Sequence, residues 1–220
     1  GNGQGEFNLY SGSFVDSGGD VRVQAGASQG LLNIYGGSFE LNASAGVLRF
    51  GSGAGTVDAI VTITNGVLAQ NASGGSIFVG AGSKRSILNI SGGTVTNKGN
   101  LSIGLGAVGT TGLVVQTGGL FIQQGTVILG RPSAATDNTV GLFTLGGGVF
   151  SNTSGLYLGG NRFGPQVNGF LTITGGTWHQ VGPVEVGSSI GYNGVHTNGA
   201  VGGIDISGGA FLASSNVVLG

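Results

Sequence analysis

The sequence contains no cysteine and no methionine, and charged residues make up 7% of its 220 positions. Without cysteine, neither a disulfide framework nor a thiolate metal site can form. The net charge of −1 and the lack of a basic stripe argue against binding to nucleic acid or to an anionic membrane. No run of about 18 apolar residues occurs, so no transmembrane helix is predicted. Because methionine is absent, we expect the chain to be a processed or excised piece.

Glycine, by contrast, supplies 51 residues, while proline supplies 3. Glycine-rich chains without periodicity are typically disordered, and disordered chains are rich in charge and poor in apolar residues. Here 39% of the residues are hydrophobic. The glycines are therefore expected to mark turns within a packed structure.

One pattern recurs along the whole chain: apolar, any, apolar, any, two small residues ending in glycine, any, apolar. It occurs eight times, in residues 7–14, 32–39, 61–68, 88–95, 113–120, 143–150, 171–178 and 204–211. The glycines that mark it are Gly12, Gly37, Gly66, Gly93, Gly118, Gly148, Gly176 and Gly209. A shorter apolar–any–apolar element follows each copy and ends in glycine everywhere except in the first, which has Gln24.

The period of two inside each element is the period of a β-strand, and no stretch shows the helical period of 3.6. A repeat of about 28 residues with two or three short strands is typical of one solenoid coil, whereas propeller blades need about 40 residues and four strands. The sequence therefore predicts an all-β, parallel β-solenoid of about eight coils. Residues 1–220 are predicted to form a single array.

Equivalent positions of stacked coils should form columns along the solenoid axis. The column that follows the glycine pair is predicted to point inward as a continuous apolar ladder. Its members are Phe14, Phe39, Leu68, Val95, Leu120, Phe150, Trp178 and Phe211. Trp178 is accordingly interpreted as a core residue rather than as a platform for a sugar.

The ends of a solenoid normally carry polar caps, because they expose strand edges and an apolar cross-section. No cap is readable at either end of this sequence. Three alternatives follow: the chain is part of a longer solenoid, copies of it stack end to end as a filament, or it is a capped monomer.

The connections at residues 131–141, 160–169 and 188–203 are longer than the others and fall at the same place in the repeat. They should emerge along one edge, which is where binding is usually added to a solenoid. We take this loop edge as a possible ligand-binding site for glycans. Its candidate residues are Arg131, Asp137, Arg162, Phe163, Tyr192 and His196.

No catalytic or cofactor site is predicted. Residues 26–30 and 187–191 match Gly-x-Ser-x-Gly, and residues 104–109 match a dinucleotide-binding pattern, but no helix follows them as these chemistries require. We interpret all three as solenoid turns. His179 and His196 are far apart with no acid near either, so no metal site is predicted. Asp205 has no carboxylate partner in its predicted column, which argues against a glycosidase pair.

The copies Leu88–Val95 and Leu171–Trp178 and the short element Leu156–Gly159 resemble the glycine-rich β-strand repeats of large bacterial secreted proteins. Such repeats occur in autotransporter-like passengers and in surface proteins with C-terminal sorting signals. The resemblance implies a right-handed β-helix, export, and a cell-surface or extracellular role without catalytic residues. We therefore expect a structural protein: a stalk, an adhesin body or a filament subunit whose partner is another copy of itself. The rival hypothesis is a solenoid that binds or cleaves glycans at the loop edge.

Overall fold

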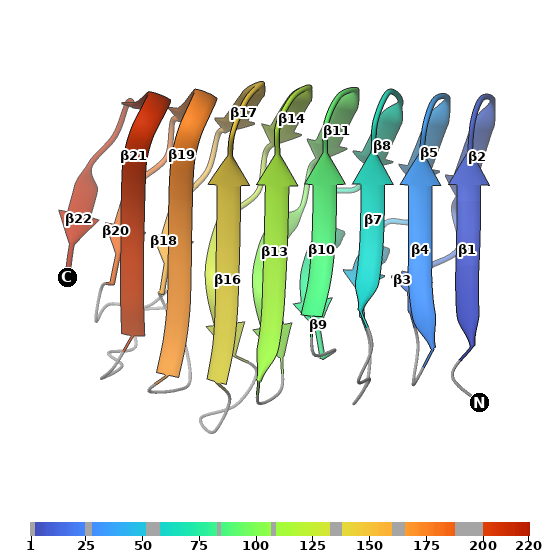
Figure 1. The fold of residues 1–220 in the computed structure, drawn as a ribbon, viewed down its shortest axis with the longest axis horizontal. Helices are drawn as coiled ribbons and strands as arrows, with labels where there is room; N and C mark the ends of the chain where they lie inside the picture. The colour runs from blue at the N-terminus through green and yellow to red at the C-terminus, as the bar shows by residue number, and fades with distance from the viewer. Residues whose placement is uncertain are drawn as a thin grey trace.

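The computed structural model describes residues 3–24, 28–51, 58–82, 85–106, 109–132, 138–159, 166–187 and 200–220. These residues form a parallel β-solenoid, and no helix occurs among them. The strands stand side by side in rows along the long axis of the molecule, with the first coil at one end and the last coil at the other (Figure 1). The predicted solenoid class is thereby confirmed.

The chain passes through three faces in every coil. The first face contains β1 (Gln4–Leu9), β4 (Gln29–Ile34), β7 (Ala59–Ile63), β10 (Arg85–Ile90), β13 (Thr110–Gln116) and β16 (Asn138–Leu145). The second face contains β2 (Ser13–Asp16), β5 (Ser38–Leu41), β8 (Val67–Gln70), β11 (Thr94–Asn97), β14 (Leu120–Gln123) and β17 (Val149–Asn152). In the last two coils one long strand covers both faces: β19 (Gln166–Gln180) and β21 (Ala200–Ala213). The third face contains β3 (Val21–Val23), β6 (Val47–Phe50), β9 (Ser76–Ala81), β12 (Asn100–Gly106), β15 (Val127–Pro132), β18 (Leu156–Leu158), β20 (Val184–Val186) and β22 (Val217–Leu219).

The number of complete coils is smaller than the number of repeats. The third face is an eight-stranded sheet in the order β22-β20-β18-β15-β12-β9-β6-β3, so β3 and β22 each have one neighbour. The solenoid accordingly has about six turns of about 28 residues rather than the predicted eight. The first and last repeats form edge coils, whose inward side chains are covered on one side.

The pairing register tests the predicted ladder directly. Phe14 pairs with Phe39, Phe39 with Leu68, and Leu68 with Val95. At the other end Phe150 pairs with Trp178, and Trp178 with Phe211. The side chains of Leu68, Val95, Phe150 and Trp178 are fully buried in the core. The inward ladder is confirmed at all of these positions, and Phe14 and Phe211 at its ends are partly buried.

The fifth coil corrects the prediction by one residue. Val95 pairs with Phe121, and Phe121 pairs with Phe150, so Phe121 and not Leu120 belongs to the ladder. Leu120 is half-buried on the outer side, whereas Phe121 is fully buried. A shift of one residue moves every side chain of a strand to the opposite face. The same shift puts Gln116 in the inward column of β13, where it pairs with Ile90.

Two corners of each coil depend on backbone conformations that favour glycine. At the corner between the first and second faces, the second glycine of the pair has positive φ in most coils, for example 70° at Gly93 and 69° at Gly119. At the corner after the third face, φ is 73° at Gly130 and also 73° at Gln24. Gln24 therefore adopts the left-handed conformation that glycine adopts in the other coils.

The third face and the start of the first face approach each other closely. A Cβ atom at Gly112 would lie 2.2 Å from the carbonyl oxygen of Val79 and 2.3 Å from the nitrogen of Gly104. The same inward column contains Gly30, Ala59, Ser86, Gly141, Gly169 and Gly202. Small residues are needed in this column because two backbones meet there.

Candidate functional site

The predicted loop edge is described at one position. Arg131 lies at the end of β15, is half-buried, and donates from Nη1 to Oγ of Ser102 in the preceding coil at 3.1 Å. Asp137, Arg162, Phe163, Tyr192 and His196 lie outside the described residues. The loop edge thus stays a prediction, and Arg131 is seen in a contact between coils.

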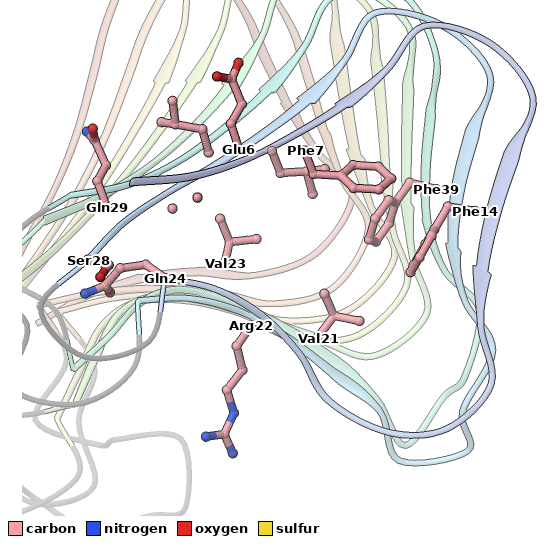
Figure 2. Close-up of a pocket in the computed structure, with 14 residues that line it drawn as sticks. Glu6, Phe7, Phe14, Val21, Arg22, Val23, Gln24, Ser28, Gln29 and Phe39 are labelled. Atoms are coloured by element: carbon pink, nitrogen blue, oxygen red, sulfur yellow. The ribbon is translucent and has the colours of Figure 1, made fainter. Parts of the chain in front are cut away.

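A cavity of about 390 Å³ opens at the first-coil end of the solenoid. Its apolar lining comes from the inward columns of the first two coils: Phe7, Phe14, Val21, Val23, Leu32 and Phe39. Figure 2 shows Phe7, Phe14 and Phe39 gathered at one corner of the cross-section. The Phe14 and Phe39 rings are stacked with centroids 4.6 Å apart, and Phe7 meets both rings edge-on.

The polar residues around this cavity surround an apolar centre. Arg22 and Glu6 point away from the interior, and Gln24 and Ser28 lie together near the opposite corner (Figure 2). Glu6 accepts hydrogen bonds through Oε1 from Nδ2 of Asn8 and of Asn33, both at 3.1 Å. The cavity therefore has the chemistry to accept apolar side chains, and its charged groups are engaged on the outer surface. We call Phe7, Phe14, Val21 and Val23 the first-coil face.

The opposite end of the solenoid presents apolar side chains as well. Its inward columns end at Ile204, Ile206, Phe211, Val217 and Leu219, which we call the last-coil face. The exposed fraction is 50% at Ile206 and 75% at Leu219, whereas Ile173 and Leu158, in the same columns within the solenoid, are fully buried. Four of the twelve large hydrophobic residues that are exposed in the described part of the chain belong to these two faces: Phe7, Ile206, Val217 and Leu219.

A cluster of charges lies on the outer side of the third face. Asp20 accepts from the Val47 N–H through Oδ1 at 3.0 Å and from Arg49 Nε through Oδ2 at 3.1 Å. Partial burial of the carboxylate acts to raise the pKa of Asp20, but the Val47 hydrogen bond and the Arg49 guanidinium outweigh it and hold the pKa below its usual value. Arg49 also lies over the Phe78 ring, 5.1 Å from its centroid. These contacts join three successive coils, so the role of the cluster is to hold neighbouring coils together.

Arg85 and Asp58 form a second ion pair, on the outer side of the first face. The Asp58 carboxylate raises the pKa of the Arg85 guanidinium. Both partners belong to neighbouring coils, and the pair is partly exposed, so its contribution to stability is small.

The residues singled out for possible chemistry do not converge in the described part of the chain. Trp178 is fully buried, and its ring is stacked on Phe150 at 3.9 Å, which confirms its assignment to the core. Asp205 pairs in register with Thr172, which carries no carboxylate. Within the described ranges, no three histidine, aspartate or glutamate side chains are grouped as metal ligands. The same ranges contain no helix that is long and apolar enough to cross a membrane.

A ladder of buried amides, which was not predicted from the sequence, lies next to the aromatic ladder. Two residues beyond the ladder position, five successive coils place a buried Gln or Asn: Gln70, Asn97, Gln123, Asn152 and Gln180. Asn97 donates from Nδ2 to Gln123 Oε1 at 2.8 Å, and Asn152 donates from Nδ2 to Gln180 Oε1 at 3.0 Å. The amides also bond turn carbonyls, as Gln123 Nε2 does with Gly99 at 2.7 Å. A period of two counted from the ladder position would have revealed this column.

The outer side of the first face carries a second unpredicted feature. One outward column of this face is apolar in six consecutive strands. Its members are Leu31, Ile60, Ile87, Leu113, Leu142 and Phe170. The first five side chains are half-buried and Phe170 is exposed. The stripe is bounded by Glu6 in the first coil and Gly203 in the last.

Comparisons of this chain with protein-family models, with curated proteins and with solved structures gave no match, so the site is interpreted from its own geometry.

Proposed function

We propose that this chain is a structural β-solenoid of an extracellular or cell-surface protein, serving as a stalk, an adhesin body or a filament subunit. The winding is expected to be right-handed, because connections between parallel strands of one sheet are right-handed in nearly all proteins. In this role the chain is a non-enzymatic building element, and its partner is another copy of itself.

The observation that carries the proposal is the match between the two end faces. Every inward column that ends in an apolar residue on the first-coil face also ends in an apolar residue on the last-coil face. Exposed strand edges beside apolar surface favour the addition of further strands. A solenoid with two such ends can therefore be extended by a coil of the same kind at either end.

Polar side chains of the described residues form bonds between coils, and these bonds support the same proposal. The buried amides bond one another and turn carbonyls, and the Asp20–Arg49 and Asp58–Arg85 pairs join neighbouring coils. Side chains of these types could serve binding or catalysis, but here they hold coils together. Bonds between coils of this kind would help a rod to keep its shape under load.

Electron microscopy of the purified 220-residue chain tests the proposed assembly. We expect fibres one solenoid wide with an axial repeat of roughly 38 Å, since eight repeats are spaced by about 4.8 Å each. Dispersed short rods at all concentrations would count against the role of filament subunit. The role of stalk would then remain as the proposal.

The proposed location needs a separate test. Antibodies raised against the chain should label intact cells of the source organism without permeabilisation. Labelling that appears after permeabilisation alone would overturn the extracellular role.

A further inference from the structure

We propose that the junction between copies has one polarity and one register: the first-coil face of one copy receives the last-coil face of a second copy, with Phe211 packed on Phe14. This inference rests on the self-association proposed above and specifies its geometry. It makes the assembly head-to-tail, and such an interface extends as an open filament when its rotation does not close a ring.

Register pairs trace each column from one end of the solenoid to the other. Phe7 begins the column that ends at Ile204, and Phe14 begins the column that ends at Phe211. On the third face, the column of Val21 ends at Val217, and that of Val23 ends at Leu219. The last-coil face therefore carries the side-chain arrangement that a coil preceding the first one would present.

The contact proposed at the junction already occurs inside the solenoid. The Phe14 ring is stacked on Phe39, with an angle of 18° between their planes. At the other end Phe211 is stacked on Trp178, with centroids 6.2 Å apart and an angle of 23°. Phe211 has an uncovered outer side, and Phe14 lines the cavity. Stacking Phe211 of one copy on Phe14 of the next continues this series.

An amide on the outer side of the first face points to the same register. Asn33 Nδ2 donates to Oδ1 of Asn8, the residue at the same place in the preceding coil, at 2.9 Å. In the proposed junction, the residue that precedes Asn8 in this column is Asp205 of the second copy. Nδ2 of Asn8 donates one hydrogen to Glu6 Oε1 and can then donate its second hydrogen to the Asp205 carboxylate, a bond that is stronger than its neutral counterpart.

The strand directions select the polarity. Neighbouring strands are parallel in every described pair, including those that β1 makes with β4 and β19 with β21. A head-to-tail junction keeps this pattern and lets apolar side chains enter the cavity. Two first-coil faces brought together would run antiparallel and would set one cavity against another. Two last-coil faces brought together would run antiparallel as well, so the head-to-tail junction is the one that keeps the parallel pattern.

Cysteine cross-linking tests the register, because the native chain has no cysteine. Ser13 and Ala210 share one outward column, so the double variant Ser13→Cys/Ala210→Cys places the two thiols opposite each other across the junction. Their Cα atoms would lie about 4.8 Å apart, within the range that a disulfide spans. Within one copy they are about seven coil spacings apart, roughly 34 Å, so the bond cannot form internally.

The matched control is Ser13→Cys/Leu212→Cys, in which the second thiol is displaced by two residues along the strand. That separation is about 8 Å, which is too long for a disulfide. Under mild oxidation we expect a ladder of linked multimers from the first variant and at least a tenfold lower yield from the control. Equal yields, or no ladder from the matched pair, would overturn the proposed register.

Two lysine variants test the polarity. Phe7→Lys blocks the first-coil face, and Leu219→Lys blocks the last-coil face. Each alone should sediment as a monomer of 21.4 kDa, and their mixture should form a dimer of twice that mass through the two intact faces. Val181→Lys changes an exposed apolar residue outside both faces and should assemble like the native chain. Thermal unfolding of each variant confirms that it is folded.

The outcomes separate this inference from the proposed function. A mixture that stays monomeric while the native chain forms fibres overturns the head-to-tail polarity and leaves the filament role standing. A native chain that stays monomeric at all concentrations overturns the junction, while labelling of intact cells still decides the extracellular role.

Discussion

The indole N–H of Trp178 donates to Oε1 of Gln180 at 3.2 Å, so the aromatic ladder and the amide ladder are joined within one strand. The same Oε1 accepts from Asn152 Nδ2 of the preceding coil. Gln180 Nε2 in turn donates to the carbonyl oxygens of Ser154 and Gly182 at 2.6 and 3.1 Å. The interior of this solenoid therefore includes a row of amide side chains. They form hydrogen bonds both with a core side chain and with the backbone of the turns.

Replacing a member of that row should be costly even when the new residue is more apolar. Gln180→Leu leaves the Trp178 N–H, the Asn152 amide and two turn carbonyls with fewer partners. We expect a loss of about 2–3 kcal/mol in the free energy of unfolding, measured by urea denaturation. Gln124→Leu, at an exposed position, is the control and should change the free energy by less than about 0.5 kcal/mol. Equal effects of the two substitutions would contradict a structural role for the amide row.

A second buried glutamine should behave differently. Gln116 occupies the inward column otherwise filled by Ile90 and Leu145, and its Oε1 has no hydrogen-bond partner among the described residues. Its Nε2 donates to the Val149 carbonyl oxygen at 3.0 Å. Because Gln116→Leu removes an unsatisfied acceptor and restores the apolar column, we expect it to be close to neutral or stabilising. Urea denaturation should show it at least about 2 kcal/mol more stable than Gln180→Leu; the reverse order would refute this account.

The close approach between the third and first faces predicts a strong effect of one methyl group. Gly112→Ala would place a Cβ atom against the Val79 carbonyl oxygen and the Gly104 nitrogen, both of them backbone atoms. We expect a loss of about 3 kcal/mol, measured as a shift in the thermal unfolding midpoint. The control is Gly5→Ala, in the same column of the first coil, where a Cβ atom has no neighbour within 4 Å. A small effect at Gly112 would show that the two backbones can separate.

The Asp20 cluster predicts a contribution to stability that depends on pH. Because its folded pKa lies below the value of 3.8 for the free side chain, Asp20 contributes stability above that pH. The contribution is lost as the pH falls through the lower folded pKa. For this partly exposed group we expect less than about 1 kcal/mol. Comparing native and Asp20→Asn unfolding at pH 7 and pH 2.5 checks it: the difference between the two proteins should shrink at the lower pH.

Much of the fold follows from the repeat, because the period of two and the glycine pair fix which side chains point inward. The predicted inward positions of the fifth repeat were one residue too early. Residues 113–115 and 114–116 both begin with an apolar residue, and either start is compatible with a strand. In most coils, the fifth included, the second glycine of the pair has positive φ, so counting from Gly119 instead of Gly118 would have placed Phe121 correctly. Gln24 stood out in the sequence as an exception, and its φ of 73° shows that its backbone conforms to the glycine pattern.

The candidate site was less predictable than the fold. The column that became the amide ladder begins with Asp16 and Leu41 and ends with Ala213, so no single residue type marks it. The cavity at the first coil depends on how Phe7, Phe14 and Phe39 pack around an uncovered cross-section, and a one-dimensional pattern does not contain that information. The close approach at Gly112 likewise arises from two segments that are adjacent only once the coil has closed.

Parallel pairing between coils also determines how the rod responds to force. The hydrogen bonds between successive coils run along the rod, since they join strands stacked in that direction. A pull applied to the two ends therefore loads an edge coil first, because its strands have neighbours on one side. Each coil that unwinds releases about 28 residues, or roughly 90 Å of extended chain, in place of a rise of about 4.8 Å. Under tension such a rod would lengthen in steps, one coil at a time from its ends, and would absorb work at each step.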